Sequence, residues 1–147
     1  MSALHVVFKV GEVEYVLPAS EVVELESYTG ATRVPGAPPY VAGLVQIRGK
    51  VIAVVDLRAR FGLPPKERTL DSRVIVVRHG TRLVGLLADS ARDVVKIDSN
   101  EFRSPPEVVS DETEGFVDSI AQPNRRLVMR VDFTKVIGRQ ELTGSTP

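Results

Sequence analysis

GLVQIRGKVIAVVDLRARFG, residues 43–62, is the stretch that decides the fold. Apolar residues fill Leu44–Ile47 and Val51–Val55, and an Arg-Gly-Lys turn at residues 48–50 separates these two runs. The glycine gives the turn the backbone freedom that a tight reversal needs. The stretch therefore predicts a buried β-hairpin.

A short helical turn is expected directly after this hairpin. Asp56 can cap it through its side-chain oxygen, and Leu57–Phe61 form the turn. Gly62 suits the end of a helix, and the Pro64-Pro65 pair prevents its continuation. Hairpin, cap and stop together make one supersecondary unit.

Arg48 is the residue of this unit that is hardest to explain as ordinary surface. It lies at the end of an apolar strand and beside a glycine. One interpretation places its stem along the core, in which case the guanidinium needs a carboxylate or several carbonyl groups. The alternative is an arginine exposed at a hairpin turn.

Composition narrows the class of protein. The chain has 147 residues, 43% of them hydrophobic, which is enough for one domain with a core of normal size. It has 19 basic and 19 acidic residues, so we expect neither nucleic acid nor anionic lipid as a partner. The absence of cysteine excludes disulfides and thiolate metal sites. No apolar run approaches the roughly 20 residues that span a bilayer, so we expect a cytoplasmic protein without direct membrane insertion.

Other strands are expected on both sides of the central unit. Each is a run rich in β-branched residues, bounded by glycine, proline or polar residues. The segment at 19–27 is expected to be a helical turn that leads into a strand, and residues 29–39 are a loop by composition. Two further hairpins are expected, from the runs Leu4–Val10 with Val13–Leu17 and Val74–Val77 with Leu83–Leu87.

The chain repeats itself at about half its length. VVFKVGEVEYVL (residues 6–17) aligns with VIVVRHGTRLVGLL (74–87), and ASEVVEL (19–25) aligns with DSARDVVKI (89–97). The most specific match sets AVVDLRARFG (53–62) over MRVDFTKVIG (129–138), where an aspartate between apolar residues precedes a glycine at the same distance. This duplication predicts two similar subdomains related by a pseudo-two-fold axis.

Each half offers four or five short strands and one helical turn, which is typical of a small β-barrel. We therefore expect an all-β fold of two five-stranded barrels around a shared core, with only a few short helices. The whole of 1–147 is treated as a single domain. Its subdomains are placed at roughly 13–65 and 66–138, with strand exchange at the ends, and 139–147 is expected to be a flexible tail.

No constellation of residues indicates an enzyme. Asp56, Asp89 and Asp132 are possible acid, base or metal-ligand carboxylates, but Asp56 and Asp132 repeat one position before a helical turn, which a capping role explains. His5 and His79 lack metal-ligand spacing, and no phosphate-binding or nucleophile motif occurs. We expect no catalysis, no metal and no cofactor. The few scattered aromatic residues also argue against a small-barrel nucleic-acid binder.

Three segments resemble the chemotaxis coupling protein family, CheW. They are VPGAPPYVAGLVQIRGKVIAVVDLRARFGL (34–63), RLVGLLADSARDVVKI (82–97) and RLVMRVDFTKVIG (126–138). The resemblance implies two five-stranded β-barrels and a free-standing, non-catalytic adaptor. Such an adaptor joins the cytoplasmic tips of chemoreceptors to the regulatory domain of the histidine kinase CheA. It is a monomer in isolation and is recruited into receptor arrays at the inner face of the membrane. The alternative is a small β-barrel module that binds another protein or nucleic acid outside chemotaxis.

The resemblance also implies a partner-binding site. Val22, Glu24, Gly43 and Arg48 match family positions where substitutions disturb the coupling of receptor to kinase. Gly43 and Val22 have a simpler explanation, since turn geometry and core packing require such residues. In the family-like fold the strand that ends at Arg48 and the segment at residues 22–25 belong to the same subdomain. Glu24 is the nearest acidic residue in this otherwise apolar run, and we expect it to form an ion pair with Arg48.

The chain departs from the family at four positions. Proline is usual where this chain has Ala53, asparagine where it has Gln46, and often glycine where it has Ser119. Arg130 puts a charge in a strand that is usually apolar. These differences indicate a divergent or specialised chemosensory system and do not identify its receptor or its kinase.

Overall fold

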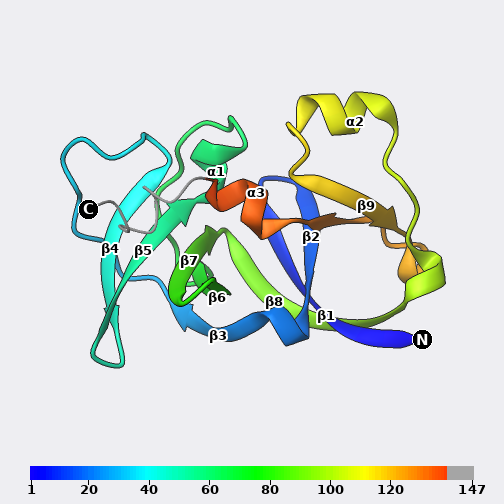
Figure 1. Ribbon diagram of the computed structural model, residues 1–147, viewed down its shortest axis with the longest axis horizontal. Helices are drawn as coiled ribbons and strands as arrows, with labels where there is room; N and C mark the ends of the chain where they lie inside the picture. The colour runs from blue at the N-terminus through cyan, green and yellow to red at the C-terminus, as the bar shows by residue number, and fades with distance from the viewer. Residues whose placement is uncertain (139–147) are drawn as a thin grey trace.

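The computed structural model describes residues 1–138, and the tail expected at residues 139–147 lies outside the described residues. The strands are β1 (Ser2–Val10), β2 (Val13–Pro18), β3 (Val22–Ser27), β4 (Val41–Ile47), β5 (Lys50–Asp56), β6 (Arg73–His79), β7 (Arg82–Ala88), β8 (Ser90–Asp98), β9 (Val117–Ala121) and β10 (Val128–Val131). The helical elements are the 3-10 turns η1 (Ala19–Glu21), η2 (Ser99–Glu101) and η3 (Pro123–Arg125), and the short helices α1 (Leu57–Arg60), α2 (Glu107–Glu112) and α3 (Phe133–Ile137). The expected all-β class with few short helices is confirmed (Figure 1).

The hairpin at the centre of the sequence forms as predicted, but it is only partly buried, since Leu44 is 36% and Val51 67% exposed. β4 and β5 pair antiparallel, with Ile47 opposite Lys50. The two turn residues, Arg48 and Gly49, have φ values of 53° and 80°. Positive φ at both central residues is what a two-residue hairpin turn requires, because it matches the twist of the flanking strands.

Two aspartates cap the two equivalent helical turns. The Asp56 carboxylate accepts hydrogen bonds from the backbone N–H groups of Arg58 (2.9 Å) and Ala59 (3.5 Å) at the start of α1. The Asp132 carboxylate accepts the N–H of Thr134 (3.0 Å) at the start of α3. The caps satisfy helix N–H groups that have no partner inside the helix. The predicted repeat of one cap in both halves is confirmed.

The ten strands form two five-stranded sheets of the same topology. One has the order β3-β6-β7-β5-β4 and is called the first barrel; the other has the order β8-β1-β2-β10-β9 and is called the second barrel. Each contains a single parallel pairing, β5 with β7 and β2 with β10, among antiparallel ones. The two sheets have the same topology, as the repeat in the sequence predicts.

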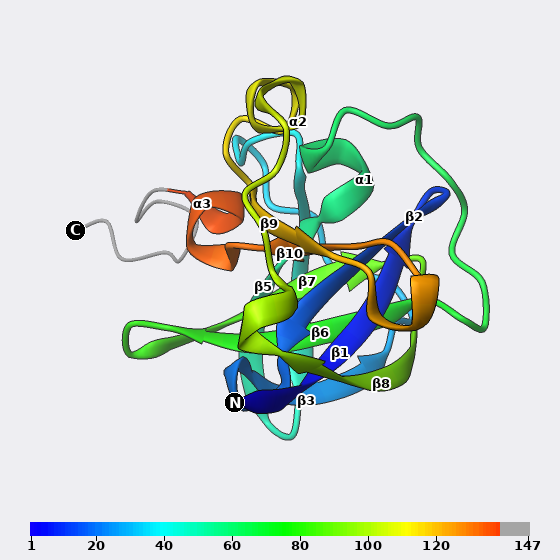
Figure 2. The ribbon, with the colours of Figure 1, turned by 90° about the vertical axis from the view of Figure 1, so that its right-hand side faces the viewer.

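The two halves of the sequence exchange their hairpins. The hairpin β1–β2 belongs to the first repeat but completes the barrel of β8, β9 and β10, while β6–β7 completes the barrel of β3, β4 and β5. A whole hairpin thus crosses in each direction, so the sheets do not follow the halves 13–65 and 66–138 (Figure 1, Figure 2). Where the boundary between the two subdomains falls stays a prediction.

Each barrel is closed by one isolated β-bridge. Thr32, after β3, exchanges two backbone hydrogen bonds of 2.9 and 2.8 Å with Leu44 of β4. Arg103, after β8, exchanges two of 2.9 Å with Ile120 of β9. We call the Thr32–Leu44 closure the first seam and the Arg103–Ile120 closure the second seam. The bridges satisfy part of the hydrogen-bonding capacity that an edge strand leaves open.

The largest hydrophobic cluster is shared by the two barrels. It draws on strands of both and on the helical turns, whose Leu57, Val136 and Ile137 are buried completely. Each barrel also has a smaller cluster of its own, around Val7 and Ile97 in the second barrel and around Ile52 and Val76 in the first. The expected shared core is therefore present.

Removing either capping aspartate should lower stability. We expect Asp56→Ala and Asp132→Ala each to reduce the free energy of unfolding by about 0.5–2 kcal/mol, because helix N–H groups lose their acceptor. Asp111→Ala, on the exposed α2, is the matched control and should change it by less than about 0.5 kcal/mol. Urea denaturation measures all three variants. Equal stability of the cap variants and the control would contradict the capping role.

Candidate partner-binding site

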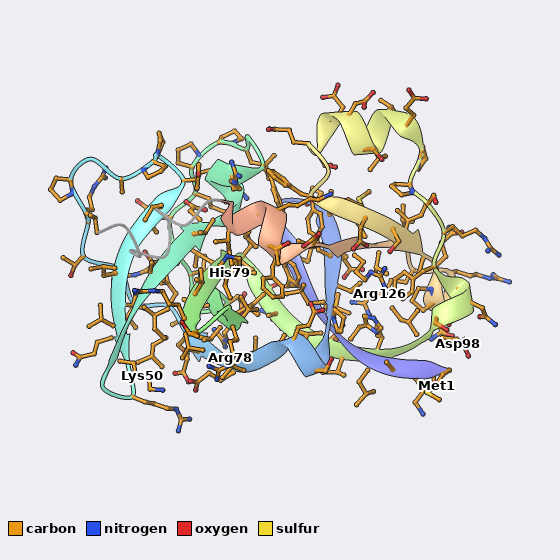
Figure 3. All side chains as sticks on the ribbon, viewed as in Figure 1. Met1, Lys50, Arg78, His79, Asp98 and Arg126 are labelled. Carbon is orange, nitrogen blue, oxygen red and sulfur yellow. The ribbon has the colours of Figure 1, made fainter. Side chains whose placement is uncertain are left out.

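Three of the four predicted site residues lie around the first seam. Glu24 is on the edge strand β3, Gly43 is on β4 at the seam, and Arg48 is in the turn between β4 and β5. This hairpin projects from the body of the molecule, and Lys50 marks its tip (Figure 3). Val22 begins β3 but packs against the shared hydrophobic cluster rather than the seam.

Gly43 is required by the close approach of two backbones. A Cβ atom at this position would lie 2.2 Å from the carbonyl oxygen of Thr32, and φ is 141°, where other residues are rare. The glycine therefore allows β4 to bridge Thr32, and any side chain would force the first seam apart. Backbone geometry thus explains why residue 43 is a glycine, as expected. The close approach lies inside strand β4, however, and not in a turn.

Glu24 and Arg48 form the expected ion pair. The Arg48 Nε atom is 2.9 Å from Glu24 Oε2 and 4.0 Å from Glu26 Oε2. The pair joins β3 to the tip of the β4–β5 hairpin, two parts that lie at opposite edges of the same sheet. It therefore spans the first seam.

The stem of Arg48 does not lie along the core, and that expectation is wrong. The Arg48 side chain is 77% exposed, whereas that of Glu24 is 21% exposed. Arg48 occupies the turn, not the strand, and its left-handed backbone directs the side chain out toward β3. The alternative, an arginine exposed at the hairpin turn, is correct. Arg48 is nevertheless paired with the Glu24 carboxylate.

Two carboxylates share this one guanidinium. A hydrogen bond between the Glu26 and Glu24 side chains is the main cause that raises the pKa of Glu26 above its ordinary value. The negative charge of Glu24 adds to this effect, and Arg48 opposes it. The seam therefore presents a fixed ion pair with a second carboxylate beside it.

An apolar groove adjoins the seam and was not predicted from the sequence. Leu44 lies at the seam and also lines this groove, which has a volume of about 820 Å³. Val34 and Val51 on its wall are 40% and 67% exposed. Its charged lining residues are all basic: Lys50, Arg78 and Arg82. The groove gathers residues from β4, β5, the β6–β7 hairpin and the loop before β4, so no local pattern indicates it.

The three aspartates considered as catalytic groups all have structural partners. Asp56 and Asp132 are caps. Asp89 Oδ2 accepts hydrogen bonds from the Gly11 N–H and from Arg58 Nη1, both at 2.8 Å. It thereby ties the tip of the β1–β2 hairpin to α1. Among residues 1–138, no cluster of three or more histidine or acidic side chains could hold a metal ion.

Arg60 has a structural role that was not predicted from the sequence. Its Nε donates to the carbonyl of Val136 (2.8 Å), and its guanidinium lies over the rings of Tyr40 (4.2 Å) and Phe116 (4.8 Å). It joins α1 to the end of α3. The repeat could have indicated this role, because it aligns the charged Arg60 with the apolar Val136.

Two of the departures from the family lie near the second seam. Ser119 aligns with Gly43 in the repeat and directly precedes the bridge residue Ile120; it is buried and donates to Asp118 (2.9 Å). Arg130 pairs with Asp118 (2.9 Å) and lies 4.5 Å from the centre of the Phe102 ring. The charge in β10 is therefore compensated.

No helix within residues 1–138 is long and apolar enough to span a membrane.

Comparison with known proteins identifies the family. The family model of the CheW-like domain matches residues 4–141. "Chemotaxis protein CheW" of Bacillus subtilis is 33% identical over 142 residues, which cover 97% of this chain and 91% of the relative. "Chemotaxis protein CheW" of Helicobacter pylori is 34% identical and covers 82% of this chain and 73% of the relative.

A solved structure has the same fold. It is the crystal structure of the scaffolding protein TtCheW from Thermoanaerobacter tengcongensis, with a TM-score of 0.85 and 31% identity. The match covers 95% of this chain and 90% of that one. The names of the two relatives refer to chemotaxis, and the name of the solved structure refers to scaffolding. The chain therefore belongs to the CheW-like domain family, whose members are non-catalytic chemotaxis scaffolds.

Proposed function

We propose that this protein couples the cytoplasmic tips of chemoreceptors to the regulatory domain of a CheA-type histidine kinase. It does so without chemistry of its own, as a cytoplasmic adaptor recruited to receptor arrays at the inner face of the membrane. Family membership supports the scaffold role, and the names of the relatives support its place in chemotaxis. Val22, Glu24, Gly43 and Arg48 are the proposed coupling residues.

The first seam is the observation that carries this proposal. Glu24 and Arg48 are paired across it at 2.9 Å, and Gly43 permits its close backbone approach. An exposed ion pair contributes at most about 1 kcal/mol to stability, so stability alone is a weak reason for this arrangement. The pair instead holds the edge of β3 and the tip of the β4–β5 hairpin in one geometry.

A partner can use the seam and the adjoining groove together. Leu44 belongs to both, so a protein that covers Leu44 meets apolar groove residues and the charged seam at once. An apolar centre with a polar rim is the usual composition of a protein–protein interface. Val22 contributes indirectly, because it packs on the shared core and thereby holds the start of β3 in place.

Co-sedimentation tests the proposal directly. Full-length protein is mixed with receptor signalling tips and a CheA-type kinase from the same chemosensory system, and the pellet and kinase output are measured. We expect the protein in the pellet and a kinase output that depends on it. Absence from the pellet, with receptor and kinase both active, would contradict the proposal.

The protein alone should show no phosphotransfer or hydrolysis. Its three candidate aspartates are all occupied by structural hydrogen bonds. We expect no ATP consumption and no phosphate incorporation by the purified chain, and an effect on kinase output only when receptor and kinase are both present. Phosphate uptake by the chain itself would overturn this expectation.

Alanine substitutions should show that Glu24 and Arg48 act as one unit. We expect Arg48→Ala and Glu24→Ala each to weaken receptor-dependent kinase output, and the double variant to be no worse than the more damaging single one. Lys96→Ala is the matched control, because Lys96 is exposed on β8 of the second barrel, lies outside the first seam and its groove, and forms no ion pair within residues 1–138. Its output should stay near that of the wild type. Simple additivity of the two single effects would show that the pair does not act as a unit.

A further inference from the structure

Residues 33–40, which we call the wall loop, form one side of the apolar groove, and residues 34–38 line it. Hydrogen bonds attach this loop to the rest of residues 1–138 only at its two ends. At its start, the first seam holds Thr32. At its end, the carbonyl oxygen of Tyr40 accepts the N–H of Asp56 at 2.7 Å. The position of this side of the groove therefore depends on these two attachments.

Arg60 of α1 reinforces the attachment at Tyr40. Its guanidinium lies 4.2 Å from the centre of the Tyr40 ring and 4.8 Å from that of the Phe116 ring. A cation over the face of an aromatic ring is attracted to it electrostatically. Arg60 forms no ion pair within residues 1–138, so its guanidinium contacts aromatic rings and backbone carbonyl groups instead of a carboxylate.

The other contacts of Arg60 fix it to elements that follow from the second barrel. Its Nε donates to the carbonyl of Val136 (2.8 Å) and its Nη2 to that of Lys135 (3.3 Å), both in α3, which follows β10. The Phe116 ring is buried and directly precedes β9. Two hydrogen bonds from one planar group orient the guanidinium, which the single ammonium of a lysine cannot reproduce. Arg60 thus joins the wall loop of the first barrel to the second barrel.

We propose that Arg60 is a positioning residue for partner binding: it holds Tyr40 in place and thereby keeps the wall loop where it shapes the groove. This inference rests on the proposed function, in which a partner covers Leu44 and the groove. Neither Arg60 nor Tyr40 lines the groove, so both act through residues 34–38. Without the contact a partner must order the wall loop when it binds, and the cost of this ordering lowers its affinity.

Amide hydrogen exchange of the full-length protein tests the positioning step without any partner. The N–H of Asp56 bonds to the Tyr40 carbonyl, and that of Val41 bonds to the Pro38 carbonyl (2.9 Å), so both report the end of the wall loop. In Arg60→Met we expect both amides to exchange about fivefold faster, the effect of losing one cation–π contact. The amides of the second seam are the internal reference and should keep their rates. Equal exchange in the variant and the wild type would overturn the proposal.

Titration of the protein into receptor signalling tips and a CheA-type kinase tests the effect on partner binding. We expect Arg60→Met to raise the protein concentration for half-maximal kinase output about fivefold. The maximal output should stay unchanged, because the first seam is intact. A wild type without receptor-dependent output would contradict the proposed function itself. A wild type with such output, and the same half-maximal concentration in Arg60→Met, would contradict this inference alone.

Variants of Tyr40 test whether Arg60 acts through this ring. Tyr40→Phe keeps the ring and is the matched control, which should behave as the wild type in both measurements. Tyr40→Leu removes the ring and should resemble Arg60→Met, and the double variant should be no worse than the more damaging single one. Additive effects of the two substitutions would contradict the proposal. If Arg60→Met does not fold, equal results for Tyr40→Leu and Tyr40→Phe would overturn it.

Discussion

The exchange of hairpins between the two repeats is the constraint on which the rest of the structure depends. Neither barrel is complete without two strands from the other half of the chain, and each foreign hairpin is held by a parallel pairing, β2 with β10 and β7 with β5. The shared hydrophobic cluster and the Asp89 contacts with Gly11 and Arg58 reinforce this exchange. The barrels therefore cannot fold or separate independently.

Several local elements of this fold were predictable from the sequence, because their signals are local, whereas α2 and β9 were not predicted. Alternating apolar residues, the Arg-Gly turn and the aspartate caps fixed the hairpins and helical turns, and the repeat indicated equal barrels. The Glu24–Arg48 pair followed from the family resemblance and is confirmed at 2.9 Å. The exchange of hairpins was not predictable in full, since strand pairing over long sequence distances leaves no periodic trace. The closing bridges of Thr32 and Arg103 lie in irregular segments, and the apolar groove assembles residues from four separate parts of the chain.

The two barrels share a topology but differ at their closures. The first seam has a glycine at the close approach and an exposed ion pair across it. The second has Ser119 at the equivalent position and rests on His5, Phe102 and Arg130. The duplication thus gives two barrels of the same topology, and different residues at the seams distinguish one barrel from the other. The two barrels therefore differ in the side chains at their seams.

We propose that the Glu24–Arg48 pair acts by holding the first seam in one geometry. Exchanging the two charges tests it most directly, because Glu24→Arg with Arg48→Glu keeps an ion pair across the seam while moving each charge. Receptor-dependent kinase output is measured for both single reversals and for the double reversal. We expect strong loss of output in each single variant and substantial recovery in the double one. A double reversal that is no more active than either single one would rule out this role of the pair and would show that a partner contacts the individual side chains.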